Sequence, residues 1–136
     1  VTEDRLRFDF SNDESVGKEK LAKIEAAINA TILENYPVSA ELMDKESAVA
    51  AGAMALFGEK YGDIVRTIAI GPRTSPYSLE LCGGLHVSKT GEIGLFRFTI
   101  EGAVAAGVRR VEAVTGATAY HYASERIDTI ERLATK

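Results

Sequence analysis

The sequence predicts an α+β fold: a mostly antiparallel sheet with helices packed on one face, and a C-terminal helix leading out of the domain. Three observations predict this class. Short segments alternate apolar and polar residues, two longer segments carry apolar residues at helical spacing, and turns rich in glycine and proline lie between them. At 136 residues the chain is long enough to bury one hydrophobic core and not two, so a single domain is expected.

The first strand is predicted at 5–10, where apolar side chains point to one face and charged side chains to the other. Its apolar residues are Leu6, Phe8 and Phe10. A helix is predicted from about 18 to 35, with Gly17 as its N-cap. The apolar stripe of this helix consists of Leu21, Ile24, Ile28 and Ile32. Pro37 ends the helix, because the residue before a proline avoids the helical conformation.

The middle of the chain alternates extended segments with turns. Strands are predicted at 38–43, 64–70, 77–81, 94–101 and 108–114, and the second of these is rich in β-branched residues. The connections are predicted as a short helix at 45–51, an ordered loop at 55–63, a turn at 71–76 and a glycine–alanine bend at 102–107.

The last helix is predicted from about 117 to 135. Its apolar stripe consists of Tyr120, Ala123, Ile127, Ile130 and Ala134. Such a narrow seam is typical of a helix that leaves a domain towards a coiled-coil partner. Over so few turns, an ordinary helix laid on the sheet is an equally good interpretation.

Composition and charge restrict the class of protein. A net charge of −4 argues against a protein that binds nucleic acid indiscriminately through phosphates, and no DNA partner is expected. A single cysteine cannot form an internal disulfide, which favours a reducing compartment. The longest mostly apolar stretch, 48–57, is too short to span a bilayer, so no membrane partner is expected. A cytoplasmic location is therefore predicted, for a chain expected to be cut from a longer protein because it lacks an initial methionine.

The only cysteine of the chain lies four positions before one of its two histidines. Cys82 and His86 offer sulfur and nitrogen donors of the kind that zinc binds, and Gly83 and Gly84 between them allow both side chains to turn towards one ion. A zinc site needs three or four protein ligands, and His121 is a doubtful third because it lies beside the stripe of the last helix. The residues alone predict half a metal site, and a buried structural cysteine stays an alternative.

Five blocks of the chain resemble motifs of a known family. They are 4–11, 52–63, 79–87, 90–94 and 105–116, and they occur in the family's order. On these motifs the chain resembles the editing domain, or second additional domain, of alanyl-tRNA synthetase, which also occurs in free-standing editing proteins. Residues 1–116 would be part of that domain, and 117–136 a C-terminal helix leading towards a linker or a coiled coil.

The resemblance implies a hydrolytic site that removes serine or glycine wrongly attached to the 3′ end of alanine tRNA, in a synthetase that binds ATP elsewhere. It implies a zinc ion held by Cys82 and His86 and by two histidines of an upstream His-x-x-x-His segment. This chain would begin after that segment, so it is expected to fold but to be poorly active alone. The resemblance does not identify the catalytic residues.

One departure from the family pattern bears on the chemistry. Leu85 stands where the family usually has threonine, so a hydroxyl near the metal is lost and the pocket becomes more apolar. Gly83, Gly84 and Leu85 are expected to shape that pocket. Candidate tRNA contacts are Lys89, Arg109 and Arg110; the last two point to opposite faces of a strand, where one could meet a phosphate and the other an acid.

Three alternatives stay open on sequence grounds. The related domain of threonyl-tRNA synthetase shares the metal-ligand pattern, although its cysteine motif differs. A tRNA-docking module that has lost its metal is a non-catalytic alternative, and Leu85 is the best argument for it. A generic structural zinc domain would unfold when the metal is removed. The oligomeric state is not predicted.

Overall fold

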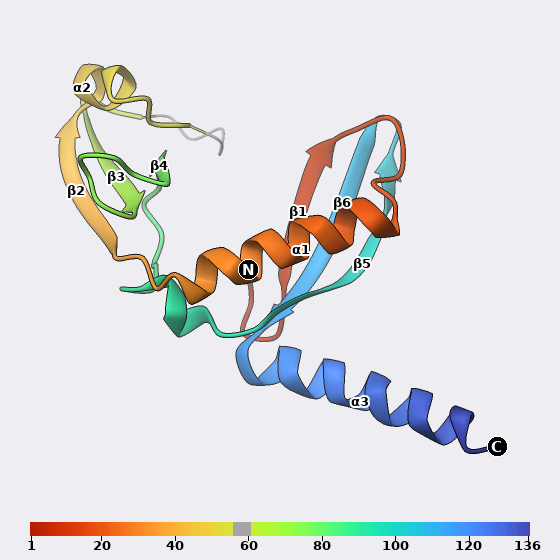
Figure 1. The fold of residues 1–136 in the computed structure, drawn as a ribbon. Coiled ribbons are helices and arrows are strands. Elements are labelled where there is room, and N and C mark those ends of the chain that lie inside the picture. Colours follow the sequence, from red (N-terminus) through yellow and green to blue (C-terminus); the bar gives the residue numbers. More distant parts are fainter. Residues whose placement is uncertain (56–60) are drawn as a thin grey trace. The chain divides into compact units, whose positions relative to one another are not determined.

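A computed structural model describes residues 1–55 and 61–136 of the chain (Figure 1). The described chain forms two compact units. The terminal unit combines Val1–Leu33 with Ile93–Lys136, and the central unit is Glu34–Glu92. Both sheets are antiparallel and helices accompany them, so the predicted α+β class is confirmed.

The terminal unit contains a three-stranded sheet in the order β1-β6-β5 (Figure 1). Its strands are β1 (Leu6–Ser11), β5 (Phe96–Ala105) and β6 (Val108–Thr115). The predicted bend at 102–107 is wrong in extent, because β5 continues through Ala105 with two register irregularities. The reversal is confined to the turn before β6, where Gly107 has a φ of 67° that favours glycine.

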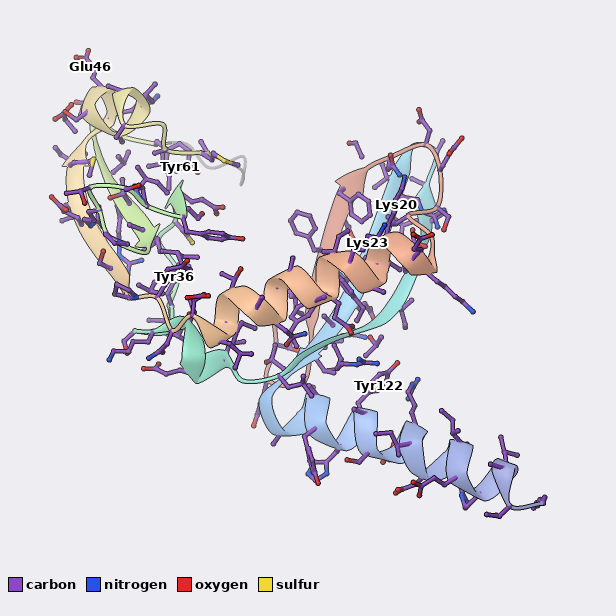
Figure 2. The ribbon with its side chains drawn as sticks, in the orientation of Figure 1. Lys20, Lys23, Tyr36, Glu46, Tyr61 and Tyr122 are labelled. Atoms are coloured by element: carbon purple, nitrogen blue, oxygen red, sulfur yellow. The ribbon has the colours of Figure 1, made fainter. Side chains whose placement is uncertain are left out.

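Helix α1 (Lys18–Leu33) belongs to the same unit and is bound to strand β5 by side chains as well as by packing. Asn29 accepts a hydrogen bond from the Phe96 N–H at 2.8 Å and donates one to the Phe96 carbonyl at 2.9 Å. Buried Ile32 packs with Phe96 and Ala113 in the core of this unit. Lys20 and Lys23, labelled in Figure 2, are exposed on the helix.

Helix α3 (Gly116–Ala134) follows β6 directly. Ala119 in its first turns is fully buried, whereas every residue from 125 to 136 is exposed. The apolar residues Ile127 and Ile130 are 55% and 65% exposed, so this half of the helix is not laid on the sheet. Of the two interpretations of its apolar seam, the structure favours a helix that leads out of the unit. Tyr122 stabilises it locally through the Arg126 guanidinium, which lies 3.6 Å from the ring centre (Figure 2).

The central unit contains a second three-stranded sheet, in the order β2-β3-β4. Its elements are β2 (Val38–Asp44), α2 (Lys45–Ala50), β3 (Ile64–Ile70) and β4 (Ser78–Leu81), and a short 3-10 helix, η1 (Thr90–Ile93), begins near its end. Asp44 caps α2 by accepting a hydrogen bond from the Ser47 N–H at 2.8 Å. The predicted loop at 55–63 lies partly outside the described residues.

Each unit has its own core, so the expectation of a single core is wrong. Ala48, Val65 and Leu81 form the buried cluster of the central unit, separate from the cluster around Phe96. The reason is the strand pairing. Among the strands of the described residues, β2 and β4 pair with β3, whereas β1 pairs with β6, which lies about a hundred positions later in the sequence. Two small sheets therefore each require an apolar cluster, where the sequence length alone suggested one.

Candidate metal-binding loop

Cys82 lies at the start of a loop that leaves the central sheet. Strand β4 ends at Leu81, which is 2% exposed and anchors the loop to the core. The Cys82 N–H donates a hydrogen bond to the Arg66 carbonyl at 3.2 Å, so the pairing with β3 extends one residue past the strand. The Cys82 side chain is half-buried, whereas His86 is exposed.

The two predicted metal donors lie beside the same glycine. A Cβ atom placed on Gly84 would be 3.5 Å from the Cys82 Sγ and 3.9 Å from the His86 Nε2. The Gly84 N–H also donates to the Cys82 Sγ at 3.4 Å. Thiolate and imidazole are the donors that zinc prefers, and glycine leaves the space between them free of a side chain. The donor pair therefore fits a zinc ion, as far as two ligands can.

A third ligand is not found within the described residues. Over 1–55 and 61–136 no group of three or more histidine, cysteine, aspartate or glutamate side chains could hold a metal ion. The doubtful candidate His121 is exposed on α3. Its ring packs edge-on against that of Tyr120, with 5.5 Å between the ring centres. Within the part of the chain that the structure describes, the donor set stays half a site.

Residue Leu85 does not pack in the folded chain, because it is 100% exposed. Lys89 is also exposed, and its backbone pairs with Pro37 in an isolated bridge at the far end of the loop. Beside it, the Ser88 hydroxyl and N–H bind the Glu92 carboxylate and are the largest causes of its lowered pKa, with Lys89 a smaller cause. Lys89 is thus available for a phosphate contact, and Leu85 for contact with a ligand.

One contributor to the loop was not found by the sequence reasoning. The Arg66 guanidinium donates from a single nitrogen to the carbonyls of Cys82 and Gly84, at 3.0 and 2.7 Å. An arginine inside an otherwise apolar β-branched strand was the available signal, since a charge placed there needs partners.

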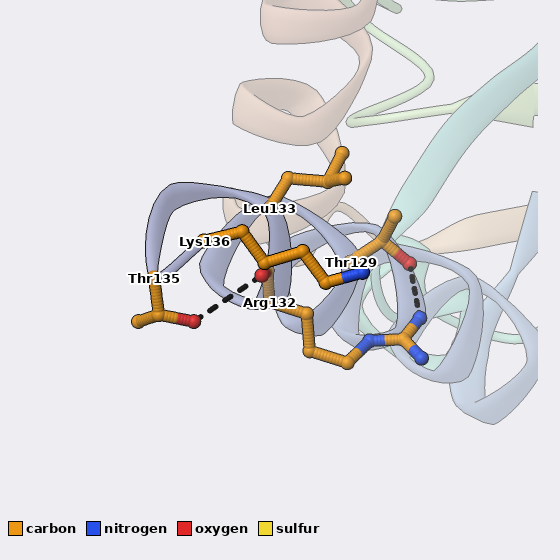
Figure 3. Close-up of a pocket in the computed structure, with 5 residues that line it drawn as sticks. All are labelled: Thr129, Arg132, Leu133, Thr135 and Lys136. Atoms are coloured by element: carbon orange, nitrogen blue, oxygen red, sulfur yellow. Dashed lines mark hydrogen bonds between the residues drawn. The ribbon is translucent and has the colours of Figure 1, made fainter.

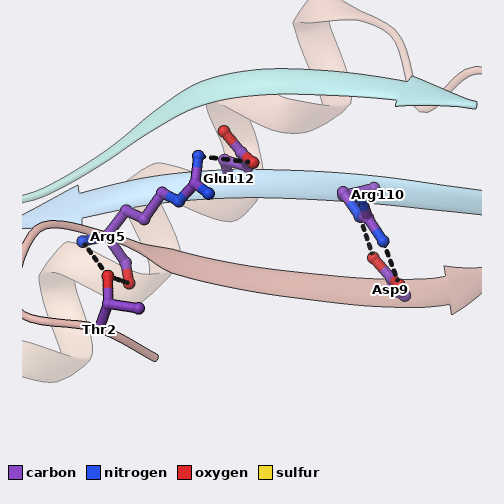
Figure 4. A network of polar contacts seen from close by, with 5 residues as sticks. All are labelled: Thr2, Arg5, Asp9, Arg110 and Glu112. Carbon is purple, nitrogen blue, oxygen red and sulfur yellow. Dashed lines mark hydrogen bonds and ion pairs between the residues drawn. The ribbon is translucent and has the colours of Figure 1, made fainter. Parts of the chain in front are cut away.

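The other two predicted tRNA contacts, Arg109 and Arg110, both hold acids in the terminal unit. Arg109 forms a bidentate pair with Glu101 at 2.8 and 2.9 Å, and Arg110 one with Asp9 at 2.6 and 2.9 Å. Figure 4 shows the second pair bridging neighbouring strands, near the Arg5–Glu112 pair at 3.4 Å. The hydrogen bonds from Arg110 are the main cause of the lowered pKa of Asp9. A phosphate would therefore have to compete with a carboxylate for either guanidinium.

The fall of the free energy of unfolding at acid pH should depend on the ion pair between Glu101 and Arg109. The hydrogen bonds from Arg109 lower the pKa of Glu101 from 4.5 to about 2. Because this pKa is lower in the folded than in the unfolded chain, the stabilisation is complete above pH 4.5 and is lost as the pH falls towards 2. Glu101→Gln is expected to lower the free energy of unfolding at pH 6 and to flatten its fall between pH 6 and 3. Urea unfolding at both pH values measures this.

The control for that measurement is Glu131→Gln, on an exposed part of α3. Its free energy of unfolding should follow the parent chain at both pH values. Identical pH dependence in the parent and in Glu101→Gln would contradict the assignment of this acid sensitivity to Glu101.

Two hollows of the terminal unit are weaker candidates for a functional site than the cysteine loop. One, of about 450 Å³, is lined by Thr129, Arg132, Leu133, Thr135 and Lys136, all at the end of α3 (Figure 3). The other, also of about 450 Å³, lies between α1 and the sheet and is lined by apolar side chains such as Phe8, Ile24 and Phe98. The second offers apolar side chains, and the first offers groups from one helix end, whereas the cysteine loop holds a thiol and an imidazole; the cysteine loop is therefore the better candidate site.

Comparison with known proteins shows what this chain is similar to. Residues 65–112, which contain β3, β4 and the cysteine loop, match the family model of the threonyl and alanyl tRNA synthetase second additional domain. Over this range the chain is similar to that family. The matched range includes Arg66, Cys82 and His86.

Two relatives with a curated name are alanine–tRNA ligases. The chain is 54% identical over 132 residues to an alanine–tRNA ligase of Chelativorans sp. (strain BNC1), covering 93% of this chain. It is 54% identical over 134 residues to an alanine–tRNA ligase of Halorhodospira halophila (strain DSM 244 / SL1), covering 98% of it. The resemblance to alanyl-tRNA synthetase that the motifs predicted is thereby confirmed. The chain spans 15% of the length of each of these relatives.

A helix that spans a bilayer must be long and apolar. Among the residues that the structure describes, no helix combines the length and the apolar character needed to cross a membrane.

Proposed function

We propose that this chain is part of the editing domain of an alanine–tRNA ligase and contributes to hydrolysis of the ester that joins serine or glycine to the 3′ end of alanine tRNA. The observation that carries the proposal is that Cys82 Sγ and His86 Nε2 both lie near Gly84, 3.5 and 3.9 Å from a Cβ atom placed there, in a chain that is 54% identical to alanine–tRNA ligases. The rest of such a ligase would bind ATP and attach alanine to the tRNA.

A second site of this kind answers a physical problem of specificity. A pocket that accepts alanine cannot exclude the smaller glycine, and it rejects serine poorly because one hydroxyl is worth only a few kcal/mol. Hydrolysis at a separate site removes the products of these errors. The substrate of this chain would therefore be an aminoacylated tRNA end rather than the free amino acid.

Cys82 and His86 are proposed as two ligands of a zinc ion, with two further histidines from an upstream segment. A zinc ion bound there would polarise or orient the ester carbonyl. Such a ligand must stay reduced, because it binds the metal as a thiolate, and this fits the expected cytoplasmic location.

The residues between the ligands contribute space rather than functional groups. A Cβ atom on Gly83 would meet nothing within 4 Å, so the space beside this residue is open. That leaves room for the terminal adenosine and its amino acid to approach the backbone closely. Exposed Leu85 would present an apolar surface to the amino acid, and Lys89 a charge to a phosphate.

The test compares three substrates in a full-length ligase that carries this chain. We expect the ligase to hydrolyse Ser-tRNA(Ala) and to spare both Ala-tRNA(Ala) and Ser-tRNA(Thr). In His86→Ala the hydrolysis should fall by about a hundredfold, whereas attachment of alanine to tRNA should stay unchanged as the control for folding.

Each other outcome identifies an alternative. Preference for Ser-tRNA(Thr) would indicate a threonyl-type domain. Binding of alanine tRNA without hydrolysis of any ester would indicate the metal-free docking module. Hydrolysis that His86→Ala leaves unchanged would contradict the role of the cysteine loop.

A further inference from the structure

We propose that Arg66 is a positioning residue for the metal donors of the cysteine loop, an inference that rests on the proposed function of that loop. Arg66 lies on β3, outside the loop, and is half-buried. Its side chain and its backbone both bind the loop. Neither the position of Cys82 nor that of His86 in the sequence indicates such a partner.

The first step of the argument is how completely Arg66 fixes the backbone of Cys82. The Arg66 carbonyl accepts from the Cys82 N–H at 3.2 Å, and the Arg66 guanidinium donates to the Cys82 carbonyl at 3.0 Å. Both polar groups of the cysteine backbone are therefore bonded to the same residue. This restricts rotation about the Cys82 backbone, and so restricts the direction in which Cβ and Sγ leave it.

The second step is that the same guanidinium also holds the residue between the two donors. One nitrogen of Arg66 reaches the carbonyls of Cys82 and Gly84, and the bond to Gly84 is the shorter at 2.7 Å. The chain must therefore turn around this nitrogen between 82 and 84. Because Sγ and Nε2 both lie within 4 Å of a Cβ atom placed on Gly84, this turn fixes the residue that lies beside both donors.

The third step is energetic. Glycines lose more conformational entropy on ordering than other residues do, so fixing a loop with two adjacent glycines in one conformation is entropically unfavourable. Hydrogen bonds from a charged donor are stronger than those between neutral groups. Within the described residues, the hydrogen bonds found for the Arg66 guanidinium go to these two loop carbonyls. These bonds offset part of the entropy that the loop loses on ordering.

A matched control lies in the same unit. The Arg73 guanidinium also bonds backbone carbonyls, those of Ser39 and Thr67 at 2.9 and 3.2 Å, and it pairs with Glu41 at 3.2 Å. None of these groups belongs to the cysteine loop. The Arg73 guanidinium also bonds the hydroxyls of Ser39 and Thr67 at 3.0 and 3.1 Å, so replacing Arg73 removes more bonds than replacing Arg66 does, without touching the metal donors.

The experiment measures metal binding rather than hydrolysis. Co²⁺ is titrated into the zinc-free full-length ligase, and the charge-transfer absorption of cobalt bound to thiolate is recorded for the parent, Arg66→Met, Arg66→Lys and Arg73→Met. We expect Arg66→Met to weaken Co²⁺ binding ten- to a hundredfold, as loss of a group that orients a ligand does. Arg66→Lys should recover part of this, because it keeps a charged donor on a shorter stem. Arg73→Met should bind as the parent does.

A second readout separates local from global effects. Without metal, Cys82 in Arg66→Met should react several-fold faster with iodoacetamide than in the parent or in Arg73→Met, while circular dichroism of the three stays the same. Parent-like cobalt binding by Arg66→Met would overturn the inference and leave the proposed function standing. Absence of cobalt binding by the parent itself would overturn both.

Discussion

Replacing Cys82 by alanine is expected to remove zinc from a full-length ligase that carries this chain, with a loss of affinity of about a hundredfold or more. A zinc site of four ligands is worth roughly 12 kcal/mol, so one ligand accounts for about 3 kcal/mol, which corresponds to about a hundredfold. Hydrolysis of Ser-tRNA(Ala) should fall with the metal. Zinc per chain, measured by atomic absorption after dialysis, tests the first expectation directly.

The second histidine supplies the control for this experiment. His86→Ala should lose zinc as Cys82→Ala does, whereas His121→Ala should keep it, because His121 is exposed on α3 and packs against Tyr120. Residues 1–136 alone should hold little zinc, since their described part offers two donors. A full equivalent of zinc in that chain would show that His121 or a second copy completes the site, and would contradict the expectation of upstream ligands.

Replacing Leu81 by alanine is expected to destabilise the central unit by about 3 kcal/mol. Leu81 is 2% exposed and packs with Val65 and Ala48, so its removal leaves a cavity between β3, β4 and α2. Because Leu81 directly precedes Cys82, the same change should weaken metal binding by loosening the start of the loop. Urea unfolding followed by circular dichroism measures the first effect, and cobalt titration the second.

Leu42→Ala is the matched control for Leu81→Ala. Leu42 lies on the neighbouring strand β2 but is 69% exposed, so the same chemical change should shift the free energy of unfolding by about 0.5 kcal/mol or less. Equal losses in the two variants would contradict the assignment of Leu81 to the core.

Local patterns were sufficient where an element depends on neighbours in the sequence. The alternation at 5–10 predicts β1 to within one residue, and the β-branched run 64–70 coincides with β3. Three residues of the predicted α1 stripe, Leu21, Ile28 and Ile32, are buried or half-buried, whereas Ile24 is 44% exposed. The helix ends at Leu33, two residues before the predicted end. These elements were predictable because periodicity reflects which face is buried, and that depends on spacing within a few residues.

The metal donors were predictable for a different reason. Cysteine and histidine are rare in this chain, and only a few residue types bind zinc, so two of them four positions apart are informative without a structure. Arg66 was not found, because arginine has many ordinary roles and its carbonyl partners Cys82 and Gly84 lie 16 and 18 positions away. Likewise Glu101 and Asp9 were not assigned to Arg109 and Arg110, since Asp9 is 101 positions from its partner.

Spacing within the chain was enough to define the elements, the candidate ligands Cys82 and His86, and the family that their motifs indicate. The tertiary structure alone decided how many cores form, which arginines are engaged by acids, and how the loop of Cys82 is held. The physical reason is the range of the interactions. Helical and strand periodicity acts over a few residues, whereas strand register brings β1 beside β6 across most of the sequence.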